Sequence, residues 1–241
     1  MSLSHKLITI YFTIFPIRLM RYHAYRIEKF VRKAAEEFDL SGNVVIDIGG
    51  GIGIYKSYFT HSKYLLQDIK QNDQGSVDFV CDIVEGASAI PSGLADAIVM
   101  TQVLEHIRDP QKVFNELARI LKPGGKIYLT THMAFEEHMR PHDYFRFTKY
   151  GLEYLGEQSG LKMNHFATHG GVFQLINYLI TGIPIRLFFS KREGFFYYAY
   201  VAIATPFLLI SGALAEFLDL FDKERRITLN MECEFIKPSN N

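Results

Sequence analysis

A glycine-rich turn and a downstream aspartate have the residue types and spacing that most clearly indicate chemistry in this chain. The apolar run 44–48 leads into four glycines within positions 49–53, and a second apolar run delivers Asp68 about twenty residues later. A buried parallel strand that breaks into such a turn is typical of a crevice that binds the ribose of a nucleotide-like ligand. The dinucleotide pattern GxGxxG fits no frame, since its last glycine would fall on Ile54, and no Gly-Lys-Ser/Thr follows. The turn therefore indicates a ligand that has an adenosine but no pyrophosphate.

Two histidines follow strands that would end in the same crevice. His106 lies just past the predicted strand 95–101, and His142 lies in the loop 138–148 after the next strand. Open α/β sheets bind ligands at the carboxyl ends of their strands. We therefore predict that His106 and His142 are the candidate general bases, needed if the acceptor must lose a proton.

The loop 138–148 is the predicted acceptor site, because polar and aromatic residues crowd together in it. Its candidate substrate-binding residues are Asp143, Tyr144 and Arg146. Asp143 could orient His142 as a base, and Arg146 could bind an acidic group of the acceptor. The alternative is that these residues only brace the loop, with Arg146 paired to Asp143.

Alternating strand-like and helix-like runs must position these residues. Strands are predicted at 43–48, 64–68, 77–82, 95–101 and 125–131, and strand-like runs follow at 162–169 and 227–236. A helix over 110–121 begins with Asp109-Pro110 as cap and first-turn proline, and a second helix begins at Thr148 and ends near Ser159. The alternation predicts an α/β fold in which helices cover both faces of a parallel sheet.

These motifs, taken together, resemble the class I S-adenosylmethionine-dependent methyltransferases, in their small-molecule (type 11-like) branch. The segment 45–53 matches the first motif of that family, Asp68 matches its ribose-binding acid, and the segment 95–106 matches its fourth-strand motif. A Pro-Gly-Gly turn follows at 123–125, and the loop His-Asp-Tyr-Phe-Arg-Phe-Thr is similar to one in a subgroup often encoded among glycan- and lipid-modifying genes. The resemblance covers about residues 40–170 together with the last strand.

The resemblance implies S-adenosylmethionine as cofactor and a Rossmann-like, seven-stranded, mostly parallel sheet with an antiparallel last strand. The cofactor-binding residues that it implies are Asp47, Gly49, Gly51, Gly53, Asp68, Asp82, Ile83 and Thr101. Glycines would let the backbone approach the methionyl part of the cofactor, and the Asp68 carboxylate would accept two hydrogen bonds from the ribose diol. The implied activity is methylation, most readily of oxygen, on a small-molecule, sugar or lipid-linked acceptor.

Glu105-His106 with His142 also resembles the metal ligands of the small-RNA 3′-terminal 2′-O-methyltransferases, and the pair resembles that of the ubiquinone-pathway O-methyltransferases. Those proteins carry a further acid three residues before the glutamate, where this chain has Gln102, a weaker ligand for a hard cation. We therefore predict no metal site.

A hydrophobic helical insertion is predicted at 171–226, before the last strand. Its segment Phe195–Ala215 carries no charge and is long enough to cross a bilayer. The chain must nevertheless return to the sheet, which excludes a single crossing. The insertion could be a hairpin that dips into a membrane, or it could cap the domain as a buried lid, bury a homodimer interface or line a hydrophobic substrate pocket. The predicted organisation is an N-terminal helical segment 1–40, a cofactor domain 41–170, the insertion, and the last strand with a tail at 227–241.

Composition limits the partners and the compartment. Lys+Arg and Asp+Glu both total 26, so no global charge favours nucleic acid. Cys81 and Cys233 have no metal-ligand spacing, which suits a reducing compartment, and no cleavable signal is evident. The basic stretch 18–33 suits a helix on an anionic surface or one that covers an edge of the domain. These features predict a cytoplasmic protein that could lie at the inner face of a membrane.

Two rival functions are compatible with parts of the sequence. The first is a membrane-associated binding or scaffold protein with a vestigial cofactor fold, against which the intact set of glycines and acids argues. The second is an NAD-dependent oxidoreductase, which the broken GxGxxG pattern disfavours.

Overall fold

The computed structural model describes residues 22–85, 87–189 and 194–239 of the chain. It divides into two compact units, of which the larger, called here the sheet unit, comprises Ile27–His169 and Asn230–Asn241. The smaller, called here the hairpin unit, includes Gly170–Leu229. The predicted N-terminal segment 1–40 can be compared only from Tyr22 onward, and the apolar residues 7–20 lie outside the described residues.

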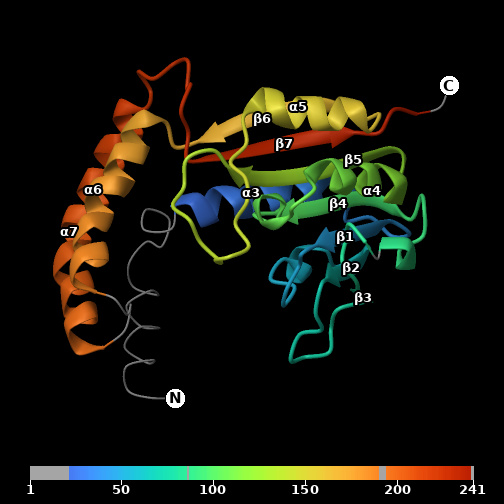
Figure 1. Cartoon of the computed structure of the whole chain (residues 1–241), viewed down its shortest axis with the longest axis horizontal. Helices are drawn as coiled ribbons and strands as arrows, with labels where there is room; N and C mark the ends of the chain where they lie inside the picture. Colours follow the sequence, from blue (N-terminus) through green and yellow to red (C-terminus); the bar gives the residue numbers. More distant parts are fainter. Residues whose placement is uncertain (1–21, 86, 190–193, 240–241) are drawn as a thin grey trace. The chain divides into compact units, whose positions relative to one another are not determined.

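A seven-stranded sheet forms the centre of the sheet unit (Figure 1). Its strands are β1 (Val44–Ile48), β2 (Lys63–Asp68), β3 (Phe79–Val80), β4 (Ala95–Thr101), β5 (Leu121–His132), β6 (Lys162–His169) and β7 (Asn230–Ile236). The spatial order is β3-β2-β1-β4-β5-β7-β6, and only β7 runs antiparallel to its neighbours. The predicted sheet, with its antiparallel last strand, is confirmed.

Helices cover both faces of this sheet. On one face α3 (Tyr22–Phe38) packs Phe30, Val31 and Ala34 against β1, β2, β4 and β5. On the other face α4 (Pro110–Ile120) and α5 (Lys149–Gln158) contribute Phe114, Leu117 and Leu152 to a larger core. Short 3-10 helices lie at Lys56–Tyr58, Ala87–Ala89 and Leu104–His106. Both faces are thus covered, and the buried positions of the central strands are mostly apolar, with Asp47, Thr130 and Thr131 as exceptions.

The predicted helix starts are found where the capping residues stand. The Asp109 side chain accepts a hydrogen bond from the Lys112 N–H at 3.1 Å, with Pro110 in the first turn. The Thr148 hydroxyl accepts one from the Gly151 N–H at 3.1 Å. Each cap satisfies one of the amide groups that have no partner inside the first turn, which is why these positions could be identified locally.

Two strands are shorter than predicted. The third strand was expected over 77–82 but has only two residues. Before it, the Leu66 N–H donates its hydrogen bond to the Asp78 side chain, where a longer strand would offer a backbone carbonyl. Asp82 and Ile83 therefore follow the end of β3 in a turn and do not end the strand itself. The last strand was expected from 227 but begins at Asn230, because Thr228 and Leu229 both donate hydrogen bonds to the Gly170 carbonyl.

The hairpin unit contains two apolar helices, α6 (Val172–Phe188) and α7 (Phe195–Leu218), which contact each other. The Asp219 carboxylate at the end of α7 accepts hydrogen bonds from the Gly171 and Phe173 N–H groups at the start of α6, at 2.7 and 2.9 Å. A carboxylate at a helix N-terminus satisfies amide donors and interacts favourably with the helix dipole. This contact ties the end of α7 to the start of α6. The predicted helical character of the insertion is confirmed.

Candidate active site

The glycine turn after β1 has the backbone geometry that its sequence suggested. Gly49, Gly51 and Gly53 have φ angles of +68°, +54° and +70°, a region that other residues rarely adopt. A Cβ at Gly49 would lie 2.5 Å from Val103 Cγ2, whereas a Cβ at Gly51 would meet nothing within 4 Å. One side of the turn is therefore closed by packing, and at Gly51 the backbone faces open space.

The structure brings Asp68 to this turn. The Asp68 carboxylate, at the end of β2, accepts a hydrogen bond from the Gly51 N–H at 3.0 Å. The Asn72 side chain donates to the Gly51 carbonyl at 2.9 Å and ties the following loop to the same residue. A carboxylate beside an exposed glycine backbone is the arrangement that a ribose diol and the adjoining part of an adenosine ligand require.

Asp47 lies beneath the turn, where it is buried. Its carboxylate accepts a hydrogen bond from the Tyr64 hydroxyl at 2.7 Å. Burial raises the pKa of Asp47 to about 7, with a further contribution from the Asp68 charge, and the Tyr64 hydrogen bond opposes the rise. A cation bound nearby would favour the ionised form of this carboxyl.

The other predicted cofactor residues lie at the ends of β3 and β4. The Asp82 carboxylate accepts a hydrogen bond from the Val84 N–H at 2.8 Å, Ile83 is buried in the core, and Thr101 hydrogen-bonds with Tyr55.

Sequence reasoning missed Gln67, which is buried beside Asp68. Its amide accepts from the Gly49 N–H at 3.2 Å and donates to the Cys81 carbonyl at 2.7 Å, so it joins the glycine turn to the segment after β3.

His106 and His142 are brought together by the loop after β5. His106 Nδ1 lies 2.6 Å from the His142 carbonyl oxygen, which can only accept, so Nδ1 carries the proton. The Nε2 atom of neutral His106 is therefore the basic nitrogen. His142 Nδ1 lies 3.0 Å from the Tyr144 hydroxyl, and that hydroxyl accepts the Arg108 Nε–H at 2.8 Å. The Tyr144 proton is thus directed at His142 Nδ1, which places the His142 proton on Nε2.

Asp143 pairs with Arg146 and not with His142. The guanidinium donates two hydrogen bonds of 2.7 Å to the two carboxylate oxygens, and Asp143 also accepts the His138 N–H at 2.9 Å. The hydrogen bonds of Arg146 hold the pKa of Asp143 well below its usual range, and the carboxylate in turn raises the pKa of Arg146. The pair of Arg146 with Asp143 that the bracing alternative expected is present, and the ring of His142 has Tyr144 as its hydrogen-bond partner instead of Asp143.

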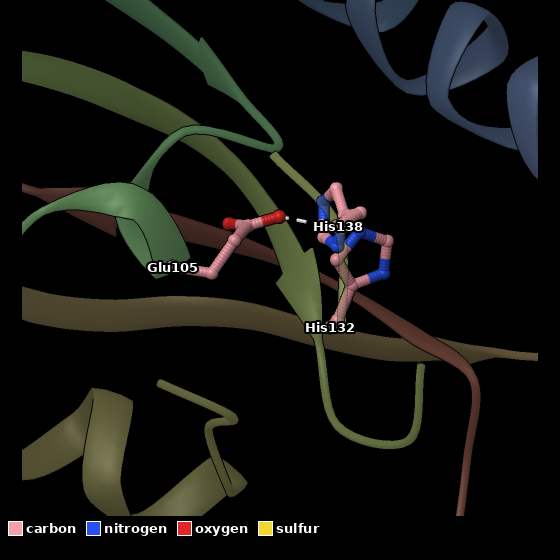
Figure 2. A group of neighbouring side chains, drawn as sticks. All are labelled: Glu105, His132 and His138. Atoms are coloured by element: carbon pink, nitrogen blue, oxygen red, sulfur yellow. Dashed lines mark ion pairs between the residues drawn. The ribbon is translucent and has the colours of Figure 1, made fainter. Parts of the chain in front are cut away.

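A group of one carboxylate and two imidazoles lies beside these residues (Figure 2). Glu105, fully buried, accepts the Thr131 hydroxyl at 3.0 Å and forms an ion pair of 3.2 Å with His132 Nε2 at the end of β5. One potential ligand atom each from Glu105, His132 and His138 lies within 4.8 Å of the others. Burial raises the pKa of Glu105, and the Thr131 hydrogen bond and His138 oppose the rise.

This cluster differs from the ligand set considered from the sequence. Glu105 belongs to both, and the structure groups it with His132 and His138, which sequence reasoning did not single out. Two imidazoles and a carboxylate suit a borderline ion such as Zn²⁺ or Fe²⁺ better than Mg²⁺. They can equally hold a proton between a buried carboxylate and two rings without any ion.

Comparison with known proteins agrees with this geometry. A family model described as a methyltransferase domain matches residues 19–172. The ubiquinone biosynthesis O-methyltransferase of Pectobacterium atrosepticum is 31% identical over 108 residues, which cover 38% of this chain and 44% of the relative. The chain thus matches less than half the length of that relative.

Solved structures show the same fold at low identity. The phosphoethanolamine N-methyltransferase 2 of Haemonchus contortus in complex with S-adenosyl-L-methionine has a TM-score of 0.50 at 17% identity, over 83% of this chain and 50% of that one. The [4+2]-cyclase SpnF has a TM-score of 0.53 at 17% identity, over 88% and 82% of the two chains. A likeness at this identity establishes the fold alone.

Family membership favours a methyltransferase over the scaffold and oxidoreductase alternatives. The turn at Gly49–Gly53, the acid at its edge and the sheet order fit S-adenosylmethionine as the cofactor. The chain belongs to the methyltransferase domain family and has the fold of the class I, S-adenosylmethionine-dependent methyltransferases.

Proposed function

We propose that the enzyme methylates a hydroxyl oxygen of a small-molecule acceptor, with His106 as the general base. The observation that carries this proposal is the hydrogen bond from His106 Nδ1 to the His142 carbonyl, which leaves the basic Nε2 on the half-exposed imidazole. Bound S-adenosylmethionine supplies an electrophilic methyl group on a good leaving group. The protein must then remove the hydroxyl proton and align the two reactants.

His106 would take the acceptor proton at Nε2 as the oxygen forms its bond to the methyl carbon. His142, whose Nε2 carries a proton, is suited to donating a hydrogen bond to the acceptor. Tyr144 fixes that proton through the contact from Arg108. Asp143 and Arg146 position the loop that carries His142, and no direct contact with the acceptor is needed for that role.

An apolar part of the acceptor would find partners in the same loop. Met139 and Phe145 expose large apolar side chains there, although the loop is otherwise polar. The relative named a ubiquinone biosynthesis O-methyltransferase supports oxygen as the methylated atom. We extend the proposal to lipid-linked acceptors met at the inner face of a membrane.

The proposed compartment is the cytoplasm. The described cysteines, Cys81 and Cys233, are free thiols, which is compatible with that compartment.

The test measures transfer of labelled methyl groups from S-adenosylmethionine to a panel of phenolic acceptors that differ in acidity. His106→Ala should lower kcat by roughly 100-fold or more for a phenol of pKa about 10, but far less for a nitrophenol that is already ionised. The exposed His61 provides the matched control, His61→Ala, which should leave both rates unchanged. An equal loss on the two acceptors would assign His106 a positioning role and contradict the base mechanism.

A further inference from the structure

The helices of the hairpin unit present large apolar side chains to their surroundings. On α7 these are Phe195, Phe196, Ile203, Phe207, Ile210 and Leu214, each between 55% and 81% exposed. On α6, Leu179, Ile180, Ile183 and Leu187 are about half-exposed or more. Only 11% of the most apolar 18-residue window of α7 is buried, whereas the core helix of a water-soluble protein is mostly buried. Among the described residues of this unit, the large apolar side chains named here therefore contribute little to its packing.

The positions that the two helices bury have the opposite composition. The buried residues of α7 are the small ones, Thr205, Gly212 and Ala215. The buried residue of α6 is Gln174, whose amide donates a hydrogen bond to the Gly212 carbonyl at 3.0 Å. Small residues and side-chain amides at the interface, with large apolar residues outside, are typical of helix pairs in lipid. A helix pair in water buries its large apolar residues instead.

Charges are confined to the ends of the helices. The sequence of α6 contains one charged residue, Arg186, in its last turn, and that of α7 contains one, Glu216, close to its end. The segment that follows α7 is rich in charge, with Asp219, Asp222 and the run 223–226. The connection between the helices, 190–193, reads Ser-Lys-Arg-Glu. The uncharged middle of both helices is thus bounded by polar residues at either end, as the hydrocarbon layer of a membrane requires.

Aromatic residues gather at the end of the unit near this connection. Phe188 and Phe189 end α6, and Phe195 begins α7, followed by Phe196 and two tyrosines. Aromatic side chains are enriched where the hydrocarbon of a membrane meets the head groups. At 1.5 Å per residue, α6 and α7 are about 25 and 36 Å long, which brackets the hydrocarbon thickness of about 30 Å.

Both ends of the hairpin join the sheet at adjacent points. β6 ends at His169 and β7 begins at Asn230, and these two residues are paired in the antiparallel ladder. The chain that leaves at one must return at the other, on the same side of any membrane. A pair of helices meets this requirement, whereas one helix does not.

We propose that α6 and α7 form a helical hairpin inserted into the hydrocarbon of a lipid bilayer, with both ends on the side of the sheet unit. The occupant of the exposed apolar surface is lipid, because that surface lies on both helices while the residues that they bury are small or polar and Gln174 bonds with Gly212 between them. A second copy of the chain, or another part of this chain, would instead cover the surface in water. The insertion goes beyond the proposed methyl transfer and is tested without it.

The experiment exploits the absence of tryptophan from the chain. Phe207→Trp places a single reporter on the exposed face of α7, and Tyr154→Trp places one at an equally exposed aromatic position on α5 of the sheet unit. Each full-length variant is reconstituted with phosphatidylcholine vesicles whose acyl chains are brominated, using unbrominated vesicles as reference. We expect the emission of the Phe207→Trp variant to fall at least twofold in brominated vesicles, and that of the Tyr154→Trp variant to be unchanged.

A second pair of variants tests the energetics of insertion. Ile203→Arg should lower the partition of the protein into vesicles roughly 100-fold, because arginine is costly at the centre of a bilayer, whereas Tyr154→Arg should not. Calorimetric binding of S-adenosylhomocysteine, measured in detergent, shows whether each variant is folded. The proposal is overturned if the Phe207→Trp emission is unquenched in vesicles. It is equally overturned if the wild-type chain stays in the aqueous phase as a monomer or as a stable dimer.

Discussion

The buried Asp47 provides a stability prediction whose sign and size follow from the structure. Its pKa of about 7 in the fold compares with 3.8 for an ordinary aspartate. A pKa raised by about 3 corresponds to about 4 kcal/mol in the free energy of unfolding. Because the folded pKa lies above the unfolded one, this stability is fully present below pH 4. It is lost progressively as the pH rises from about 4 to about 7.

Asp47→Asn removes the titration but keeps a side-chain oxygen that can accept the Tyr64 hydroxyl hydrogen bond. The ligand-free wild type should therefore become less stable relative to the variant by up to about 4 kcal/mol between pH 4 and pH 8. The measurement is urea unfolding of both proteins in the same detergent at several pH values. Other titrating groups are common to the two proteins and cancel in the difference. A difference that does not change with pH between 4 and 8 would refute the assignment of a raised pKa to Asp47.

Three further outcomes are expected from the cofactor turn and the acceptor loop. Asp68→Ala should weaken S-adenosylmethionine binding by roughly 100-fold in calorimetry, since two charge-assisted hydrogen bonds are lost, while the exposed control Asp73→Ala leaves the affinity unchanged. Gly49→Ala should lower the melting temperature more than Gly51→Ala, because both have positive φ but only the first Cβ meets Val103; equal shifts would contradict the packing argument. Arg146→Ala should cost about 2–3 kcal/mol of stability, as the buried Asp143 carboxylate loses its partner, and the loss should shrink at low pH where that carboxyl is protonated.

The cofactor half of the site was predictable because its determinants are local. A few neighbouring residues are enough to indicate each of them. Gly51 is a glycine with positive φ, Asp109 caps a helix, and Asp68 is a carboxylate at the end of a strand. The strand order also follows from alternation, since parallel strands joined by helices permit few topologies. Gln67 could have been suspected as a polar residue inside an apolar strand, but its two partners lie in other segments.

The acceptor half of the site was predicted less well because its residues are paired across the fold. Asp143 and His142 are adjacent in sequence, but the carboxylate turns to Arg146, whose planar guanidinium offers two hydrogen bonds at once. His132 resembles any strand residue in the sequence, and it meets Glu105 only because β4 and β5 end side by side. The choice of His106 as base depends on a carbonyl 36 residues away.

By itself, the sequence determined the class of fold, the methyl donor and the presence of an apolar hairpin, because these depend on periodicity and on motifs shorter than about ten residues. The tertiary structure alone decided which groups face one another: Glu105 with His132 and His138, His106 with a loop carbonyl, and Gly212 of α7 with Gln174 of α6. The reason is physical. Hydrogen bonding and packing depend on distances of a few ångströms, and these distances are set only when strands and helices far apart in the chain are brought together.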